Sequence, residues 1–192
     1  MRIGSKNMIK RKIEEDVFKK FGTGKAIVIL GARQTGKTTL LHQLFDNHEK
    51  VLWLNGDEPD VRSIFDNITS SRLKSIIGNQ NIVIIDEAQR ISDCGVKLKL
   101  MTDQMPTVQL IVSGSSSLDL SGKIKEPLTG RKWEYLLFPM NFQELVAHHG
   151  LLEEQRLLNH RLVYGSYPEI VTSPGNEKEI LKQLTDSFLY KD

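Results

Sequence analysis

Cysteine is almost absent from this sequence, which has one such residue, Cys94, in 192 positions. One thiol can form neither a disulfide framework nor a cysteine-rich zinc site within a single chain. We therefore expect a fold that is held together by its hydrophobic core. The shortage of cysteine is typical of the reducing cytosol, and we expect a cytoplasmic protein.

Long apolar runs are missing as well. No run approaches the roughly 20 residues that a membrane-spanning helix needs, and the amino terminus is polar and basic, unlike a secretory signal. We therefore expect no membrane partner. A strong excess of one charge is also lacking: the formal net charge is +2, whereas nucleic-acid binding needs basic residues concentrated on one face. Composition alone leaves a DNA or protein partner open.

What the sequence does contain is five short runs rich in β-branched and aliphatic residues, which is typical of strands. These runs are residues 26–30, 50–54, 81–85, 108–112 and 134–138. Three of them, AIVIL, NIVII and VQLIV, show little alternation, as expected for strands of a parallel sheet that is covered on both faces. The segments between the runs are long enough for crossover helices. We therefore predict an α/β fold with a parallel sheet flanked by helices.

Apolar residues at helical spacing predict where the helices lie. A helix that starts near Gly36 would present Leu40, Leu41, Leu44 and Phe45 to the sheet. Further helices are predicted over residues 60–77 and 96–101. Ile9, Ile13, Val17 and Phe21 form one apolar stripe at a spacing of four, which predicts an amino-terminal helix.

The pattern of apolar residues changes after Pro139. Three segments with helical spacing follow, without another strand of comparable quality. We therefore predict two domains: a core over residues 1–140, in which 1–24 are an amino-terminal helical segment, and a helical region over residues 141–192. The last helical pattern still carries unpartnered apolar residues near Asp192. We expect the helical region to be truncated, although a last helix docked on its own domain would explain the same residues.

The run "GARQTGKT" matches the phosphate-loop pattern G-x-x-x-x-G-K-[ST] without a mismatch, between a predicted strand and a predicted helix. Glycines allow a tight turn whose N–H groups cradle phosphate oxygens beside the positive end of the helix. Lys37 is predicted to reach the β- and γ-phosphates and the Thr38 hydroxyl to ligate Mg²⁺. The alternative without a binding function is a tight turn between strand and helix whose lysine is solvated. The predicted nucleotide-binding residues are Gly31, Ala32, Arg33, Gln34, Thr35, Gly36, Lys37, Thr38 and Thr39.

Two adjacent carboxylates, Asp86 and Glu87, follow the apolar run NIVII. Ligands of open α/β sheets bind outside the carboxyl ends of the strands. Asp86 is predicted to hold Mg²⁺ through its water shell, and Glu87 to orient and deprotonate an attacking water. The alternative is a surface helix that carries acidic residues in its first turn.

The choice of nucleotide follows from another absence. The chain lacks the N-K-x-D sequence by which GTPases read guanine, so we expect ATP with Mg²⁺ as the ligand rather than GTP. A small-molecule kinase would share the phosphate loop, but nothing in the sequence identifies an acceptor pocket. We therefore predict ATP hydrolysis, with ATP and ADP as the small-molecule partners.

At this point the chain resembles the AAA+ superfamily of ATPases, and within it the prokaryotic AAA-domain type 14 group. The resemblance covers most of the chain from Ala26 onward, in family order. It rests on "VILGARQTGKTTLL", "IVIIDEAQR", "LIVSGSSSLDL", "LTGRKWEYLLFPMNFQEL" and "YGSYPEIV". It implies a P-loop NTPase fold with a five-stranded parallel sheet in the order 5-1-4-3-2, followed by a helical lid.

The resemblance also implies three further roles. A polar residue after the strand VQLIV would be sensor 1, which contacts the γ-phosphate or the attacking water. Ser113, Gly114, Ser115 and Ser116 follow, and Ser115 is our choice; a flexible serine loop is the alternative.

Arg131, directly before the fifth strand, matches the arginine finger that a neighbouring subunit supplies, which implies a homo-oligomer. The alternative is a surface arginine that anchors a strand end. In the family the amino-terminal segment runs past the adenine, so Ile9 or Arg11 would line the base, although plain packing explains the stripe.

Two other classes of function compete with a working ATPase. A nucleotide-operated regulatory switch would use the same site but hydrolyse ATP slowly. An ATPase module of a DNA-associated protein would need residues outside this chain and would bind DNA in a salt-sensitive way.

Overall fold

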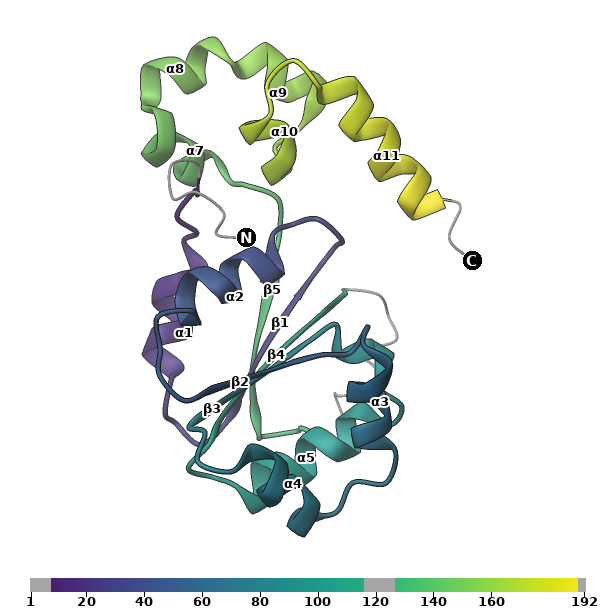
Figure 1. Cartoon of the computed structure of the whole chain (residues 1–192). Coiled ribbons are helices and arrows are strands. Elements are labelled where there is room, and N and C mark those ends of the chain that lie inside the picture. The colour runs from purple at the N-terminus through teal and green to yellow at the C-terminus, as the bar shows by residue number, and fades with distance from the viewer. Residues whose placement is uncertain (1–7, 116–126, 190–192) are drawn as a thin grey trace. The chain divides into compact units, whose positions relative to one another are not determined.

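The computed structural model describes residues 8–115 and 127–189 of the chain. Five parallel strands form one sheet in the order β2-β3-β4-β1-β5. Read from β5, this is the predicted order 5-1-4-3-2, which is thereby confirmed. The strands are β1 (Ala26–Gly31), β2 (Val51–Asn55), β3 (Ile82–Asp86), β4 (Gln109–Ser115) and β5 (Lys132–Leu137). Figure 1 shows the sheet with its helices.

The chain divides into two compact units. The first, which we call the sheet unit, comprises Ile13–Arg33 and Lys37–Leu137. The second, the helical unit, comprises the described parts of Met1–Lys12 and Phe138–Asp192 together with Gln34–Gly36. The predicted domains, 1–140 and 141–192, were drawn from sequence texture and stay a prediction.

The sheet unit has a helical layer on each face of the sheet (Figure 1). Helices α1 (Ile13–Lys20) and α2 (Lys37–Phe45) contribute to one buried cluster, and α3 (Pro59–Asp66), α4 (Ser70–Ile77) and α5 (Cys94–Gln104) to the other. β1 supplies both clusters: Ile27 and Ile29 face α2, whereas Val28 and Leu30 face the opposite side. The side chains alternate between faces because the period of a strand is two. Burial on both faces explains why AIVIL has no polar position.

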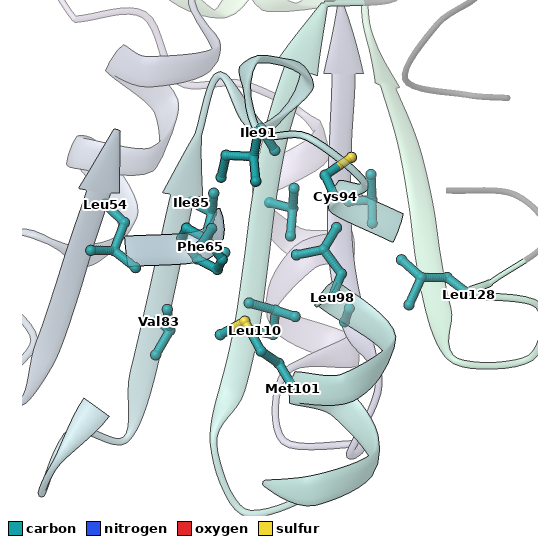
Figure 2. Packing of buried hydrophobic residues seen from close by; sticks show 14 of the residues in the cluster. Leu54, Phe65, Val83, Ile85, Ile91, Cys94, Leu98, Met101, Leu110 and Leu128 are labelled. Atoms are coloured by element: carbon teal, nitrogen blue, oxygen red, sulfur yellow. The ribbon is translucent and has the colours of Figure 1, made fainter. Parts of the chain in front are cut away.

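The larger cluster is drawn in Figure 2, where Ile85 of β3 and Leu110 of β4 lie with Phe65, Leu98 and other residues from the covering helices. The single cysteine, Cys94, is buried in this cluster at 1% exposure. It therefore behaves as a small apolar side chain.

One predicted helix was wrong. Residues 60–77 form two helices, α3 and α4, instead of one. Thr69 has an extended backbone, with φ −118° and ψ 162°, and its side chain accepts a hydrogen bond from the Arg72 N–H at 3.3 Å. An N-cap residue of this kind ends one helical path and begins another.

The predicted amino-terminal stripe is also divided. Helix α1 begins only at Ile13, and Val17 packs in the sheet unit with Phe45. Ile9 instead packs with Met140 and Leu145 in the helical unit. The spacing of four is therefore shared by two different clusters and does not mark one helix face.

The helical unit has no described strand. Its helices are α7 (Phe142–His149), α8 (Leu151–Arg156), α9 (Leu158–Tyr164), α10 (Pro168–Thr172) and α11 (Glu177–Leu189). Asn141 and Glu144 form a capping box at the start of α7, because each side chain accepts a hydrogen bond from the main-chain N–H of the other. Among the described residues, no helix is long and apolar enough to cross a membrane.

Candidate active site

The carboxyl ends of β1, β3 and β4 bring three predicted site residues to one edge of the sheet. Gly31 at the end of β1 is in register with Ser115 of β4. Asp86 ends β3, and the residue before it, Ile85, pairs with Val112 of β4. Parallel strands place all their carboxyl ends at the same edge, where open α/β sheets bind ligands.

The loop between β1 and α2 has the backbone of an anion-binding turn. Gln34 and Gly36 both lie in the left-handed region, with φ of 60° and 89°. Residues of this kind between right-handed neighbours aim successive N–H groups into one concavity. Helix α2 starts at Lys37, so Thr38 and Thr39 lie in its first turn and the positive end of its dipole faces the loop.

Lys37 is folded back along this loop. Its Nζ donates to the carbonyl oxygens of Gly31 at 3.1 Å and Ala32 at 2.9 Å, and the residue is only 5% exposed. Burial lowers the pKa of Lys37, Arg33 lowers it further, and the nearby carboxylates Glu87 and Asp86 oppose the shift. The lysine and both carboxylates are therefore close enough to act on one another electrostatically.

Asp86 lies at the centre of a hydroxyl and carboxylate cluster. Its Oδ2 accepts the hydroxyl of Thr38 at 2.6 Å, and its Oδ1 accepts the hydroxyl of Ser113 and the main-chain N–H of Glu87. The two predicted Mg²⁺ ligands, Thr38 and Asp86, are thus adjacent.

The donor set fits Mg²⁺. Mg²⁺ takes hard oxygen ligands and keeps several waters, so one hydroxyl and one carboxylate beside a phosphate site are enough protein ligands. In the described part of the chain, no group of three or more His, Cys, Asp or Glu side chains could hold a metal ion by itself. Any cation bound here would therefore take most of its ligands from water and from phosphate oxygens.

Glu87 has an unusual backbone and a specific partner. It lies in the left-handed region, with φ 49° and ψ 41°, where the chain turns into the short helix η1 (Ala88–Arg90). The amide of Gln89 donates to the Glu87 carboxylate, and its oxygen accepts the main-chain N–H of Ser115 at 3.2 Å. Gln89 therefore links the predicted general base to the end of β4.

Arg131 lies apart from this cluster. It precedes β5, and its neighbour Lys132 is in register with Ala26, the first residue of β1. At about 3.3 Å per residue, the length of β1 separates this edge from the phosphate loop by roughly 16 Å. Arg131 Nε pairs with Asp103 at 2.6 Å. The residue is therefore not part of its own chain's site, and a role in a neighbouring subunit stays a prediction.

Two residues at this edge escaped prediction, and a third was weighed but not chosen. Ser113, rather than Ser115, places its hydroxyl on Asp86, and it is fully buried. Gln89 is visible in the sequence as part of "DEAQR", but no pattern assigned it a role. Gly56 gave no signal at all, although a Cβ there would lie 2.4 Å from the Glu87 carbonyl oxygen. Ser116, the other serine weighed, is outside the described residues.

Similarity to known proteins identifies the family of the chain and its fold. A model of the AAA domain family of type 14 matches residues 23–146, which is more than half of the chain. The chain belongs to this AAA family. The predicted family is thereby confirmed, and the AAA chain has the P-loop ATPase fold expected of it.

Relatives of this AAA chain extend well beyond it. An uncharacterized protein of Methanocaldococcus jannaschii is 27% identical over 94% of the chain, but the match covers only 44% of that relative. A second relative, from Haemophilus influenzae, is 26% identical over 86% of the chain and is covered to 45%. The chain thus spans less than half the length of these two curated relatives.

Two solved structures share the fold at low sequence identity. The Walker-type ATPase of Pyrococcus abyssi has a TM-score of 0.62 at 16% identity, covering 95% of this chain and 73% of that one. A signal transduction ATPase with numerous domains from Pyrococcus horikoshii has a TM-score of 0.57 at 14% identity, covering 95% of this chain and 33% of that one. At such identities the likeness supports the fold alone.

Proposed function

We propose that this AAA chain binds ATP together with Mg²⁺ and hydrolyses it to ADP and phosphate. The observation that carries the proposal is the position of Asp86. Its carboxylate accepts a hydrogen bond at 2.6 Å from the hydroxyl of Thr38, the last residue of the phosphate-loop motif. A phosphate-binding turn alone would support nucleotide binding. A carboxylate and hydroxyl pair beside it, followed by a second carboxylate, supports phosphoryl chemistry.

Each residue has a role in this proposal. Lys37 and the loop N–H groups bind the phosphate oxygens, and Thr38 and Asp86 hold the cation. Bound Mg²⁺ would neutralise charge on the β- and γ-phosphate oxygens. Glu87 orients a water and accepts its proton, while Ser115, at the end of β4, contacts the γ-phosphate. Arg131 is supplied to the site of a neighbouring subunit in a homo-oligomer, in which case assembly completes the site.

A nucleotide-operated switch is the second candidate, and one observation favours it. The Glu87 carboxylate is already bonded to the Gln89 amide, so the general base is engaged by the protein itself. If this bond persists when ATP is bound, hydrolysis would be slow and the bound nucleotide would act as a signal. Comparing single-turnover with steady-state rates of phosphate release distinguishes a switch from a working enzyme.

Binding is tested by calorimetric titration with ATP, ADP and GTP, with and without Mg²⁺. We expect binding of ATP and ADP that Mg²⁺ strengthens. Lys37→Ala should weaken it about tenfold to a hundredfold, because a hydrogen bond to a charged group contributes about 1.5–3 kcal/mol. Lys74→Ala, at an exposed position of α4, is the control and should bind as the unaltered chain does. Absence of heat at millimolar ATP would contradict the proposal, and equal affinity for GTP would contradict the preference for adenine.

A further inference from the structure

Arg11 is a buried cation, and one of its hydrogen bonds ends on the phosphate loop. Its Nη1 donates to the carbonyl oxygen of Thr35 at 2.9 Å and its Nη2 to the carbonyl oxygen of Phe138 at 2.6 Å. Its Nε donates to the carboxylate of Glu144 at 3.1 Å. Both charged side chains are only 5% exposed. All of these residues belong to the helical unit.

The bond to Thr35 has a consequence for the peptide that follows. In a planar trans peptide the C=O and N–H bonds point in opposite directions. When Arg11 holds the Thr35 carbonyl on its own side, the N–H of Gly36 must point to the other side. A phosphate loop binds anions through N–H groups that are turned inward while the carbonyls are turned out, so this bond fixes one peptide in the orientation that anion binding requires.

The neighbourhood of Gly36 limits the alternatives for this peptide. Gly36 has φ 89°, a backbone conformation that residues with a side chain rarely adopt. A Cβ at Gly36 would lie 3.6 Å from Cγ of Pro168 and 3.8 Å from Nη1 of Arg11. The same guanidinium therefore packs against Gly36 and bonds to the residue before it.

Glu144 holds the guanidinium in place. Its Oε1 also accepts the main-chain N–H of Lys12 at 2.8 Å, and its Oε2 accepts the N–H of Asn141 at 2.9 Å. A carboxylate with three main-chain and side-chain donors is fixed in position, so the fork of Arg11 is fixed as well. Lysine has one nitrogen and could not reach acceptors on three segments with this geometry.

We propose that Arg11 is a positioning residue for nucleotide binding, which sets the phosphate loop in its anion-binding conformation by holding the Thr35 carbonyl outward. The inference rests on the proposed function, because it concerns the same phosphate site. It differs from the expectation that Arg11 lines the adenine, since the three bonds of its guanidinium end on protein acceptors. Arg11 acts through the loop and does not itself contact the phosphates.

The test compares a full nucleotide with the phosphate chain alone. Mg-ADP and inorganic tripolyphosphate are titrated into the unaltered chain, Arg11→Lys and Arg11→Met. A misaligned loop loses at least one charge-assisted N–H bond to phosphate, so we expect at least about tenfold weaker binding of both ligands by Arg11→Met. Arg11→Lys should fall between Arg11→Met and the unaltered chain. Glu144→Gln retains an oxygen acceptor for the capping box. It should reduce the affinity for both ligands less than Arg11→Met does.

Arg161→Lys is the matched control. Arg161 pairs with the buried carboxylate of Glu154 at 2.9 Å in the same unit and has no bond to the loop among the described contacts. Arg161→Lys should lower the melting temperature about as much as Arg11→Lys does, and it should leave the affinities for Mg-ADP and tripolyphosphate unchanged. A melting curve of every variant gives the temperature at which all of them are folded. If Arg11→Met does not fold, the affinities of Arg11→Lys for the two ligands decide whether Arg11 has the positioning role.

The outcomes separate the two roles of Arg11 from each other and from the proposed function. Equal weakening of ADP and tripolyphosphate binding by the Arg11 variants, with no loss in Arg161→Lys, supports the positioning role. Loss of ADP binding with unchanged tripolyphosphate binding overturns it in favour of a contact with the base or ribose. Unchanged affinity for both ligands, or an equal loss in Arg161→Lys, also overturns it. If the unaltered chain binds neither ligand, the proposed function itself fails and the inference falls with it.

Discussion

The two edges of the sheet carry charged residues in very different settings. At the carboxyl edge, Lys37 and Asp86 are 5% and 7% exposed and bond to neighbouring carbonyls and hydroxyls. At the amino edge, the pair between Arg131 and Asp103 is 40% and 36% exposed. An exposed ion pair contributes about 0–1 kcal/mol, whereas a buried polar group left without its partner costs about 1–3 kcal/mol.

This difference shows where the sequence is constrained by chemistry. The same parallel strands run between both edges, so strand formation alone would tolerate charges equally well at either end. Among the described residues, Lys37, Asp86 and Ser113 are buried together where the loop, β3 and β4 converge, whereas the amino edge buries the uncharged Gln109. Such a cluster is costly unless it is fully bonded, which supports selection for a bound ligand at that edge and for surface solubility at the other.

The largest expected difference between the two edges is the effect of Glu87→Gln on turnover compared with that of Glu134→Gln. Removing the proposed general base should lower the turnover number by about a hundredfold or more, because general-base catalysis contributes about 10²–10⁴ in rate. Binding of ATP should be retained, since the amide has the same shape. Phosphate release under saturating ATP measures the turnover, and calorimetry measures the affinity.

Glu134 is the matched control, because it is an exposed carboxylate of β5 that pairs with Lys132 at the amino edge. Its substitution should change neither quantity. Full turnover by Glu87→Gln would remove Glu87 from the mechanism, and an equal loss in Glu134→Gln would erase the distinction between the edges.

Most of the carboxyl edge could be predicted, because its residues follow from local patterns. The phosphate loop is contiguous in the sequence, and Asp86 is marked by the end of an apolar strand. Ser113 was weighed but not chosen and Gln89 was not predicted, since their roles depend on the register of β3 with β4 and on the turn at Glu87. Register is set by the pairing of segments distant in the sequence, which no local pattern shows.

The fold follows the same rule. β1 and β3 were readable because burial on both faces leaves no polar residue in β1 and none in β3 before Asp86. The break between α3 and α4 was missed because apolar residues continue at helical spacing across Thr69. The amino-terminal stripe was misread for a related reason: Ile9 and Val17 have the right spacing but pack in different units.

A smaller effect should distinguish the serines at the end of β4. The Ser113 hydroxyl bonds to Asp86, whereas Ser115 contributes its main-chain N–H to Gln89. Ser113→Ala removes one bond to a charged group, but Asp86 Oδ1 keeps the Glu87 N–H at 3.0 Å. We therefore expect about a tenfold loss of turnover, with a raised Mg²⁺ requirement, because the bond lost involves a charged acceptor.

Ser115→Ala retains the main-chain bond and is the matched variant. On geometry alone it should lower turnover less than Ser113→Ala does. Magnesium titrations of phosphate release by both variants give the comparison. The reverse order would make the contact of Ser115 with the γ-phosphate the more important of the two, and the bond from Ser113 to Asp86 a structural one.

The smallest effect within one chain is expected for Arg131→Ala. Its exposed pair with Asp103 contributes at most about 1 kcal/mol to the free energy of unfolding, and the residue lies at the edge away from the phosphate loop. ATP affinity should be unchanged. Turnover of a dilute monomer should also be unchanged, because Arg131 does not reach its own site.

The role of Arg131 in a neighbouring subunit is tested by raising the protein concentration. If the arginine completes a partner's site, specific activity of the unaltered chain rises with concentration and that of Arg131→Ala does not. Mixing Arg131→Ala with Glu87→Gln then restores activity, since one variant supplies the intact carboxylate and the other the arginine. If specific activity is independent of concentration and mixing restores nothing, Arg131 is an anchor for the start of β5, and the functional asymmetry between the edges is complete within one chain.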